Sequence, residues 1–369
     1  MQKAVGIIDL FSGCGGSALG FMHAGFSVRV AVDNDSLASE SFRLNFPECT
    51  VITSDITYLS GKELLKAGGF RDGREVVLIG CPPCQGFSNA RKISQRLTDP
   101  RNMLVYEFLR IVEEIRPFAL VMENVAGLLK GAGKPIFLQI IQRLHDVGYQ
   151  TVYDVINTAN YGVPQKRRRL VLLGTNKPDL RLTLPNKTNS NPQLSEKLPP
   201  WKTVRDTIFN LPPIKAGEVY CDDTLHISAK LSEINLNRLK NTPSDGGDRT
   251  SWPEDLFLDC HRSIDGYKDV YGRMKWDSPA PTITGGCVMI SKGRFGHPEQ
   301  NRAISLREAA RLQTFPDSFN FRGNIGQIAK QIGNAVPPLL AKRIADALLQ
   351  SIGELEIAEK LISNIKDNS

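Results

Sequence analysis

A short apolar run that leads directly into a glycine-rich turn and a helix opens the chain, and it constrains the fold most. Residues 5–11 read Val-Gly-Ile-Ile-Asp-Leu-Phe, which is typical of a buried strand. Residues 12–18 contain three glycines, and an apolar helix start follows. Glycines let the backbone approach a ligand closely, and a helix N-terminus favours polar or anionic groups. The sequence therefore predicts a strand, a ligand-binding turn and a helix.

The spacing within this turn indicates the kind of ligand. Gly13, Gly15 and Ala18 satisfy the dinucleotide fingerprint, and a second strand, 27–32, ends in Asp33. A carboxylate about 20 residues after the first glycine suits a ribose diol. We expect a nucleoside cofactor, and the pattern does not separate NAD from S-adenosylmethionine. Alternatively, residues 12–18 only form a tight turn of small residues and bind no cofactor.

Apolar runs of strand length continue to alternate with helix-length segments through the first half of the chain. This alternation predicts an α/β fold with a doubly wound, Rossmann-like sheet. The expected helices are 36–46, 103–115 and 135–147, and the expected strands are 49–52, 75–79, 119–122, 151–158 and 169–174.

Composition excludes several classes of protein. Hydrophobic residues make up 41% and charged residues 23%, as in ordinary soluble proteins. No apolar run approaches the ~20 residues that span a bilayer, and the first strand begins too early for a signal peptide. Seven cysteines, an odd number, favour free thiols in a reducing compartment. We expect a cytoplasmic protein without membrane contact, whose net charge of +7 permits a polyanionic partner.

A stiff turn follows the strand 75–79. Pro82 and Pro83 forbid a helix there, so Cys84 sits on a rigid turn at the end of a buried strand. Such a cysteine suits a nucleophile, but Cys81 and Cys84 also read as C-x-x-C, which fits a redox pair or half a metal site. The polar, basic segment 89–101 that follows is expected to be a loop that contacts phosphates or is simply solvated.

Two later stretches carry further polar candidates. Glu123 directly follows a buried strand, so it should lie in the crevice where open α/β sheets bind ligands, or be a salt-bridged strand-end acid. In the segment 160–169, alternation would point Gln165, Arg167 and Arg169 to one side. Arginine offers a fixed fork for phosphates, carboxylates or a base carbonyl.

The composition changes at about residue 176. Residues 176–200 are rich in Pro, Asn, Thr and Ser and read as a linker, and the segment to about 280 lacks strong periodicity. We expect a second, smaller, irregular domain made mainly of strands and loops. Cys260 and His261 lack a second ligand pair, so we expect no metal site. Helices are expected at 305–313 and 326–332, and then two amphipathic helical segments.

Six short motifs follow one another along nearly the full length of the chain. They are Asp9-Leu10-Phe11-Ser12-Gly13-Cys14-Gly15-Gly16, Pro82-Pro83-Cys84-Gln85, Glu123-Asn124-Val125, Gln165-x-Arg167-x-Arg169, Arg307-Glu308-Ala309-Ala310-Arg311-Leu312-Gln313 and Gly333-Asn334-Ala335-Val336-Pro337. Any one of them is weak or moderate evidence, but together, in this order and with this spacing, they resemble the motifs of the DNA (cytosine-5)-methyltransferase family and are not a chance match.

The resemblance implies a class I methyltransferase fold, with a catalytic domain at 1–175 plus 326–369 and a target-recognition domain at 176–325. It implies S-adenosylmethionine as the cofactor, S-adenosylhomocysteine as its product, and no metal. The partners implied are double-stranded DNA and a cognate restriction endonuclease, with the protein itself a monomer. The implied cofactor residues are Phe11, Gly13, Gly15, Asp33, Asp55, Ile56, Pro83, Asn334 and Val336, and the implied DNA-binding residues are Gln85, Ser88, Arg91, Lys92, Arg96 and Gln165.

By the same resemblance, Cys84 would add to C6 of a flipped-out cytosine, and Glu123 would bind N3 and the amino group. Arg167 and Arg169 would stabilise O2 or orient the acid. The sequence departs from the family at Asp33, where a glutamate is usual, and at Cys81, where a glycine is frequent. We expect Cys81 to be an incidental thiol.

Three alternatives remain at this level. A tRNA-modifying relative shares most of the motifs, although the long 176–300 insertion favours DNA. A DNA-binding relative without catalysis conflicts with the intact Cys84, Glu123 and Arg167. A nicotinamide oxidoreductase leaves the Pro-Pro-Cys and Q-x-R-x-R motifs unexplained.

Overall fold

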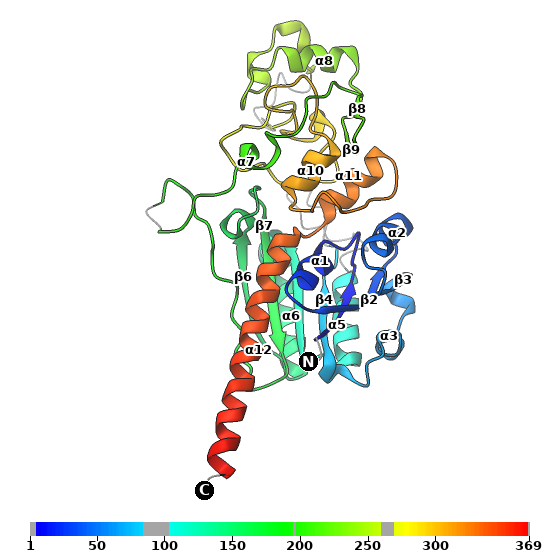
Figure 1. Ribbon diagram of the computed structural model, residues 1–369, viewed down its shortest axis with the longest axis vertical. Coiled ribbons are helices and arrows are strands. Elements are labelled where there is room, and N and C mark those ends of the chain that lie inside the picture. The colour runs from blue at the N-terminus through cyan, green and yellow to red at the C-terminus, as the bar shows by residue number, and fades with distance from the viewer. Residues whose placement is uncertain (1–4, 84–102, 195–196, 260–268, 368–369) are drawn as a thin grey trace. The chain divides into compact units, whose positions relative to one another are not determined.

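The computed structural model describes residues 5–83, 103–194, 197–259 and 269–367 (Figure 1). The chain divides into two compact units. Unit 1 comprises Met1–Asn157, Arg168–Lys187 and Pro338–Ser369, and unit 2 comprises Thr158–Arg167 and Thr188–Pro337.

These bounds differ from those expected at 175 and 326. The segment after 175 stays with unit 1 because Asn176 Nδ2 donates to the Pro117 carbonyl at 3.2 Å and Leu180 is buried. The assignment of one part to catalysis and the other to target recognition stays a prediction.

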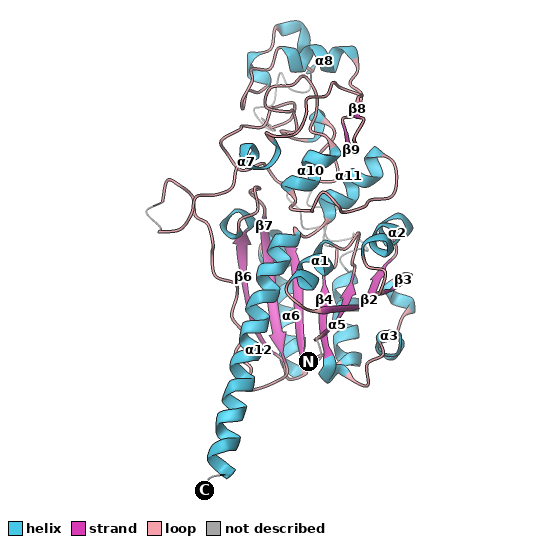
Figure 2. Ribbon diagram, viewed as in Figure 1, coloured by secondary structure: helices cyan, strands magenta, loops and turns pink. Residues whose placement is uncertain are grey.

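A mixed sheet forms the centre of unit 1 (Figure 2). Its strands are β1 Gly6–Leu10, β2 Ser27–Asp33, β3 Thr50–Thr53, β4 Val76–Gly80, β5 Ala119–Val125, β6 Gln150–Asn157 and β7 Arg168–Thr175. Their order is β3-β2-β1-β4-β5-β7-β6; the first five are parallel, and β7 is antiparallel to both of its neighbours. The predicted doubly wound α/β fold is confirmed. The strand order reverses between β1 and β4, where such sheets bind ligands beyond the carboxyl ends of the strands.

Helices cover both faces of this sheet, with α1 and α12 on one face and α5 and α6 on the other (Figure 1). The helices of unit 1 are α1 Gly16–His23, α2 Ser36–Asn45, α3 Gly61–Gly68, α5 Leu104–Ile115, α6 Gly133–Asp146 and α12 Pro338–Asp367, and its 3₁₀ turns are η1 Ile56–Tyr58, η2 Gly73–Glu75 and η5 Ala126–Leu129. Ile8 and Leu10 of β1 pack with Phe108 and Ile111 of α5 in the main hydrophobic core.

Two helical predictions need correction. The C-terminal part forms one continuous helix, α12, and not two segments, because an isolated glycine such as Gly353 costs a helix only about 1 kcal/mol. Helix α3 was not predicted, although its capping box of Ser60 and Glu63 is a readable start signal.

Unit 2 contains more helical turns than strands. Its elements are α7 Val204–Ile208, β8 Val219–Tyr220, β9 Asp223–Ile227, α8 Glu233–Lys240, α10 Leu306–Leu312 and α11 Ile325–Asn334, with η6 Thr158–Tyr161, η7 Arg249–Ser251, η8 Glu254–Leu256 and η9 Ile290–Lys292. The expectation of mainly strands is therefore wrong for the described residues. One small hydrophobic core of unit 2 is formed by residues from widely separated stretches, among them Leu239, Trp252, Tyr271 and Ile290. No local periodicity in the sequence therefore predicts this core.

Candidate active site

The turn between β1 and α1 is held in left-handed backbone conformations. Phe11, Gly13 and Gly15 have φ of 57°, 54° and 103°. A Cβ at Gly15 would collide with Phe42 and Phe46, whereas one at Gly13 would meet no described atom within 4 Å. The backbone at Gly13 therefore lies open on one side, as close approach to a ligand requires. A non-glycine residue at positive φ, such as Phe11, is typical of functional sites.

Asp33, at the end of β2, braces this turn. Its Oδ2 accepts a hydrogen bond from the Gly13 N–H at 2.8 Å, and its Oδ1 accepts one from the Asp35 N–H at 2.8 Å. The two contacts fix the carboxylate beside the glycine turn. Next along the sheet, Asp55 Oδ1 accepts from the Thr57 N–H at 3.0 Å, and Ile56 is buried in the core.

Glu123 and Arg169 form an ion pair on neighbouring strands. Arg169 Nε lies 2.9 Å from Glu123 Oε1, and the two side chains are only 15% and 11% exposed. The strands β5 and β7 run antiparallel, with Arg169 opposite Val125, two residues beyond Glu123. The register thus places a strand-end acid and an arginine together.

Asn124 ties the strand of this acid to the proline turn. Its Nδ2 donates to the Pro82 carbonyl oxygen at 3.0 Å, and its Oδ1 accepts from the Val125 N–H at 2.8 Å. The residue is buried, so the contact is shielded from water.

Pro83 is half-buried. Cys84, Gln85, Ser88, Arg91, Lys92 and Arg96 lie outside the described residues.

The Q-x-R-x-R stretch shows the expected alternation of burial. Gln165 and Arg167 are buried, Lys166 and Arg168 are exposed, and Arg169 is half-buried. Within unit 2 the Gln165 amide is saturated and faces away from solvent. Its Oε1 accepts from the Ile283 N–H at 2.8 Å, and its Nε2 donates to Gln313 Oε1 at 2.8 Å.

Arg167 binds backbone carbonyls in unit 2. Its Nη1 donates to the carbonyl oxygens of Ile283 at 3.0 Å and Gly333 at 3.1 Å. Gly333 begins the Gly-Asn-Ala-Val-Pro motif, in which Asn334 ends α11 and Val336 is buried. Gln313 Nε2 donates to the Ala335 carbonyl oxygen at 3.3 Å, so Arg167 and Gln313 both contact the backbone of this motif. Sequence reasoning missed Gln313, for which the only signal was its place in the Arg-Leu-Gln end of a helix.

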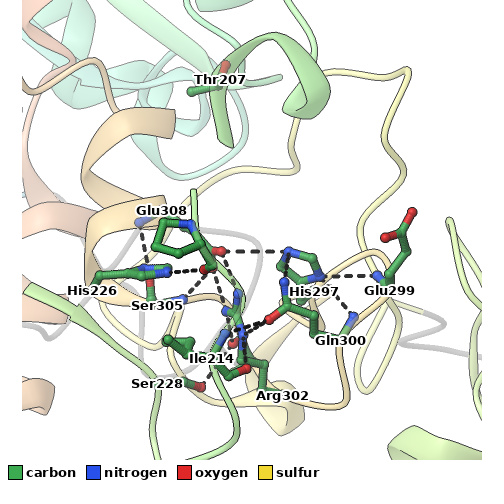
Figure 3. A network of polar contacts seen from close by, with 12 residues as sticks. Thr207, Ile214, His226, Ser228, His297, Glu299, Gln300, Arg302, Ser305 and Glu308 are labelled. Atoms are coloured by element: carbon green, nitrogen blue, oxygen red, sulfur yellow. Dashed lines mark hydrogen bonds and ion pairs between the residues drawn. The ribbon is translucent and has the colours of Figure 1, made fainter. Parts of the chain in front are cut away.

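A buried polar network fixes the start of α10 (Figure 3). Glu308 accepts hydrogen bonds from both terminal nitrogens of Arg302, each at 2.7 Å, and from the Ser305 N–H at 2.7 Å. Burial raises the pKa of Glu308, but the hydrogen bonds and charge of Arg302 outweigh it and bring that pKa down to about 2. Ser305 caps the helix, and its Oγ lies 2.8 Å from His226 Nδ1.

His297 completes the network as a neutral ring (Figure 3). Its Nδ1 accepts from the N–H groups of Glu299 at 3.1 Å and Gln300 at 3.0 Å, so the ring hydrogen sits on Nε2. Nε2 lies 3.7 Å from Glu308 Oε1. Burial lowers the pKa of His297 to about 4.

Comparison with known proteins defines the family. A family model of C-5 cytosine-specific DNA methylases matches residues 5–350. The chain is 38% identical over 349 residues to the type II methylase M.HgiDII of Herpetosiphon aurantiacus, covering 93% of this chain and 94% of that relative. The chain belongs to the C-5 cytosine-specific DNA methylase family.

Further similarities agree with this methylase assignment. The chain is 38% identical over 347 residues to the type II methyltransferase M1.HphI of Haemophilus parahaemolyticus, covering 93% and 86% of the two chains. It also matches the crystal structure of a protein described as a prophage-encoded DNA modification methyltransferase (E. coli), with a TM-score of 0.73 and 25% identity over 95% of this chain and 100% of that one. The resemblance drawn from the motifs is confirmed, and the enzyme is a DNA (cytosine-5)-methyltransferase.

Two properties of the methylase concern metals and membranes. Within the described ranges, no group of three or more His, Cys, Asp or Glu side chains could hold a metal ion. In the same part of the chain, no helix is long and apolar enough to cross a membrane.

Proposed function

We propose that the enzyme transfers a methyl group from S-adenosylmethionine to C5 of a cytosine flipped out of a specific duplex DNA sequence, through a covalent bond between Cys84 and C6. The observation that carries this proposal is the contact between Asn124 and the Pro82 carbonyl. It joins Pro82, which precedes Cys84 by two residues in the sequence, to the strand that bears Glu123.

The reaction begins with addition of the Cys84 thiolate to C6, which forms a C–S bond and moves an electron pair onto the ring. Glu123 stabilises this charge by donating a proton to N3 and accepting a hydrogen bond from the exocyclic amino group, and Arg169 holds Glu123 in one orientation. S-adenosylmethionine supplies the methyl group. The electron pair on the ring forms the bond from C5 to this methyl group. Loss of the C5 proton to a base then frees the C–H electron pair to re-form the C5–C6 double bond, and the C–S bond breaks to release Cys84 as a thiolate.

The residues around the glycine turn fit this cofactor. The open side of Gly13 and its N–H bond to Asp33 leave the turn both accessible and fixed. Asp33 would bind the ribose diol, as expected for the acid that ends the second strand. The other cofactor residues in the proposal are Phe11, Gly15, Asp55, Ile56, Pro83, Asn334 and Val336.

Two roles change in light of the contacts. Gln165 is fully buried with both ends of its amide bonded, so we assign it a positioning role in place of a DNA contact. Arg167 likewise acts on the Gly333 backbone. DNA contacts are assigned to Gln85 and Ser88, which follow Cys84, and to Arg91, Lys92 and Arg96 of the basic segment 89–101.

The biological setting is inferred from the relatives, two of which are named as type II enzymes. We assign the protein to a restriction-modification system, where a cognate endonuclease would cut the same unmethylated site. It would act as a monomer in the cytoplasm.

Transfer of a labelled methyl group tests the substrate class. Purified enzyme with labelled S-adenosylmethionine should methylate duplex DNA and leave tRNA unlabelled, and bisulfite sequencing should place the methyl groups in one short sequence. Labelling of tRNA without labelling of any DNA would overturn the proposal in favour of the tRNA-modifying alternative.

A further inference from the structure

Asp9 is a carboxyl group buried at the point where the sheet reverses its strand order. It is the next-to-last residue of β1 and lies between Ala31 of β2 and Ile79 of β4. The mechanism proposed above does not use it. The carboxyl end of β1 is nevertheless where a doubly wound sheet receives its ligand.

The side chain of Asp9 is fully buried, and neither carboxylate oxygen has a hydrogen-bond partner of ordinary geometry among the described residues. Burial and then the nearby Asp33 carboxylate raise the pKa of Asp9 well above its usual range, while the Ala18 N–H in the first turn of α1 opposes them. Buried carboxylates are normally paired with a cation or fully hydrogen-bonded. Asp9 therefore calls for an explanation.

Within the part of the chain that the structure describes, the polar groups found to act on Asp9 carry no positive charge. They are the Asp33 carboxylate from β2, the Ala18 N–H from α1, and the thiols of Cys81 after β4 and Cys49 before β3. Asp33 itself is compensated by two backbone N–H groups. Asp9 is thus an uncompensated carboxyl beneath the turn that would hold the cofactor.

We propose that Asp9 distinguishes the cofactor from its product by charge. S-adenosylmethionine carries a sulfonium cation that S-adenosylhomocysteine lacks, and this cation stabilises the Asp9 carboxylate through the low-dielectric interior. The inference rests on the proposed use of S-adenosylmethionine. Binding of the cofactor would release the proton of Asp9, and loss of the sulfonium charge on methyl transfer would weaken the hold on the product.

Calorimetric titration of the DNA-free enzyme tests this without any turnover. Titrations in two buffers of different ionisation enthalpy give the number of protons released on binding. S-adenosylmethionine should release more protons than S-adenosylhomocysteine. The affinity for S-adenosylmethionine should rise with pH, whereas that for S-adenosylhomocysteine should not. Asp9→Asn should reduce the preference for S-adenosylmethionine by about tenfold, the order expected for one charge. As a control, Ile56→Val should change both affinities by the same factor.

The results distinguish failure of the inference about Asp9 from failure of the proposed function. An unchanged preference in Asp9→Asn, or equal losses for both ligands as a purely helix-capping role predicts, would overturn the inference alone. Wild-type protein that binds neither ligand would overturn the proposed function as well. If Asp9→Asn does not fold, the proton counts of the wild type decide, and equal counts for the two ligands would refute the inference.

Discussion

At the scale of single residues, Glu123 depends on partners that come from other strands. Arg169 pairs with it across β5 and β7, and Asn124 next to it holds the Pro82 carbonyl. An acid that binds a flipped-out base speeds the reaction more if it is already held in place, because a preorganised charge needs no rearrangement during the reaction. Under the proposed mechanism, Arg169 would serve catalysis by positioning Glu123.

We predict that Arg169→Ala lowers kcat about 100-fold, since the acid loses the group that orients it. The neighbouring Arg168 is exposed, and Arg168→Ala is the matched control, expected to stay within about threefold because exposed charges contribute little. Single-turnover methylation of duplex DNA gives both rates. Equal rates for the two variants would show that the ion pair does not matter.

The surroundings of Cys81 bear on whether it is a redox partner of Cys84 or an incidental thiol. Burial, and next the carboxylates of Glu123 and Asp9, raise the pKa of its thiol well above the usual range. Its sulfur lies 3.6 Å from Ser17 Oγ. A thiol held protonated is a poor nucleophile, which favours the incidental role expected for Cys81.

At the scale of elements, α1 and α12 pack so closely that one contact requires glycine. A Cβ at Gly20 would collide with the Pro338 carbonyl oxygen and with Ala341. Gly353 lies further along α12, and a Cβ there would meet no described atom within 4 Å. The two glycines therefore form a matched pair for substitution.

Gly20→Ala should lower the free energy of unfolding by about 1–3 kcal/mol, as overpacking does. Gly353→Ala should raise it by about 0.5–1 kcal/mol, because alanine is the better helix former. Urea denaturation followed by circular dichroism measures both changes. Destabilisation of similar size in the two variants would contradict this account of the helix contact.

The network at the start of α10 makes unit 2 sensitive to acid. His297 has a pKa of about 4 in the folded protein, against about 6.5 when unfolded, so the unfolded chain binds more protons between these values. Stability is fully present above pH 6.5 and falls by up to about 3 kcal/mol as the pH drops to 4. Glu308 adds a loss below pH 4.5, because its folded pKa is lowered to about 2.

Tryptophan fluorescence can follow this loss selectively, because Trp201, Trp252 and Trp276 all belong to unit 2. The urea midpoint of the fluorescence transition should fall between pH 7 and pH 4.5. His297→Gln should flatten that dependence, whereas His145→Gln, at an exposed position on α6, should preserve it. A wild-type midpoint that is constant over this range would refute the assignment.

The central strands of unit 1 were readable because β1, β4 and the first part of β5 are short apolar runs. Unit 2 was not readable in this way. Arg273, for example, donates to the carbonyls of Leu239, Thr242, His297 and Gln300. Such contacts join distant stretches and leave no periodic pattern.

The same limit applied to the candidate site. The motifs identified Glu123 and the arginines, but the bond from Asn124 to Pro82 spans 42 residues and that from Gln165 to Gln313 spans 148. Sequence spacing predicts which residue types are needed, whereas these contacts depend on the strand order and on how the helices pack.

At the scale of the whole molecule, the central proposal is that this C5 methyltransferase uses Cys84 as its nucleophile. Duplex DNA containing 5-fluorocytosine tests this directly, since fluorine at C5 cannot leave as a proton and the C–S bond then persists. Enzyme with this DNA and S-adenosylmethionine should give a denaturation-resistant adduct, which Cys84→Ser abolishes and Cys81→Ser retains. An adduct that survives in Cys84→Ser, or none on any DNA that the enzyme methylates, would contradict the account.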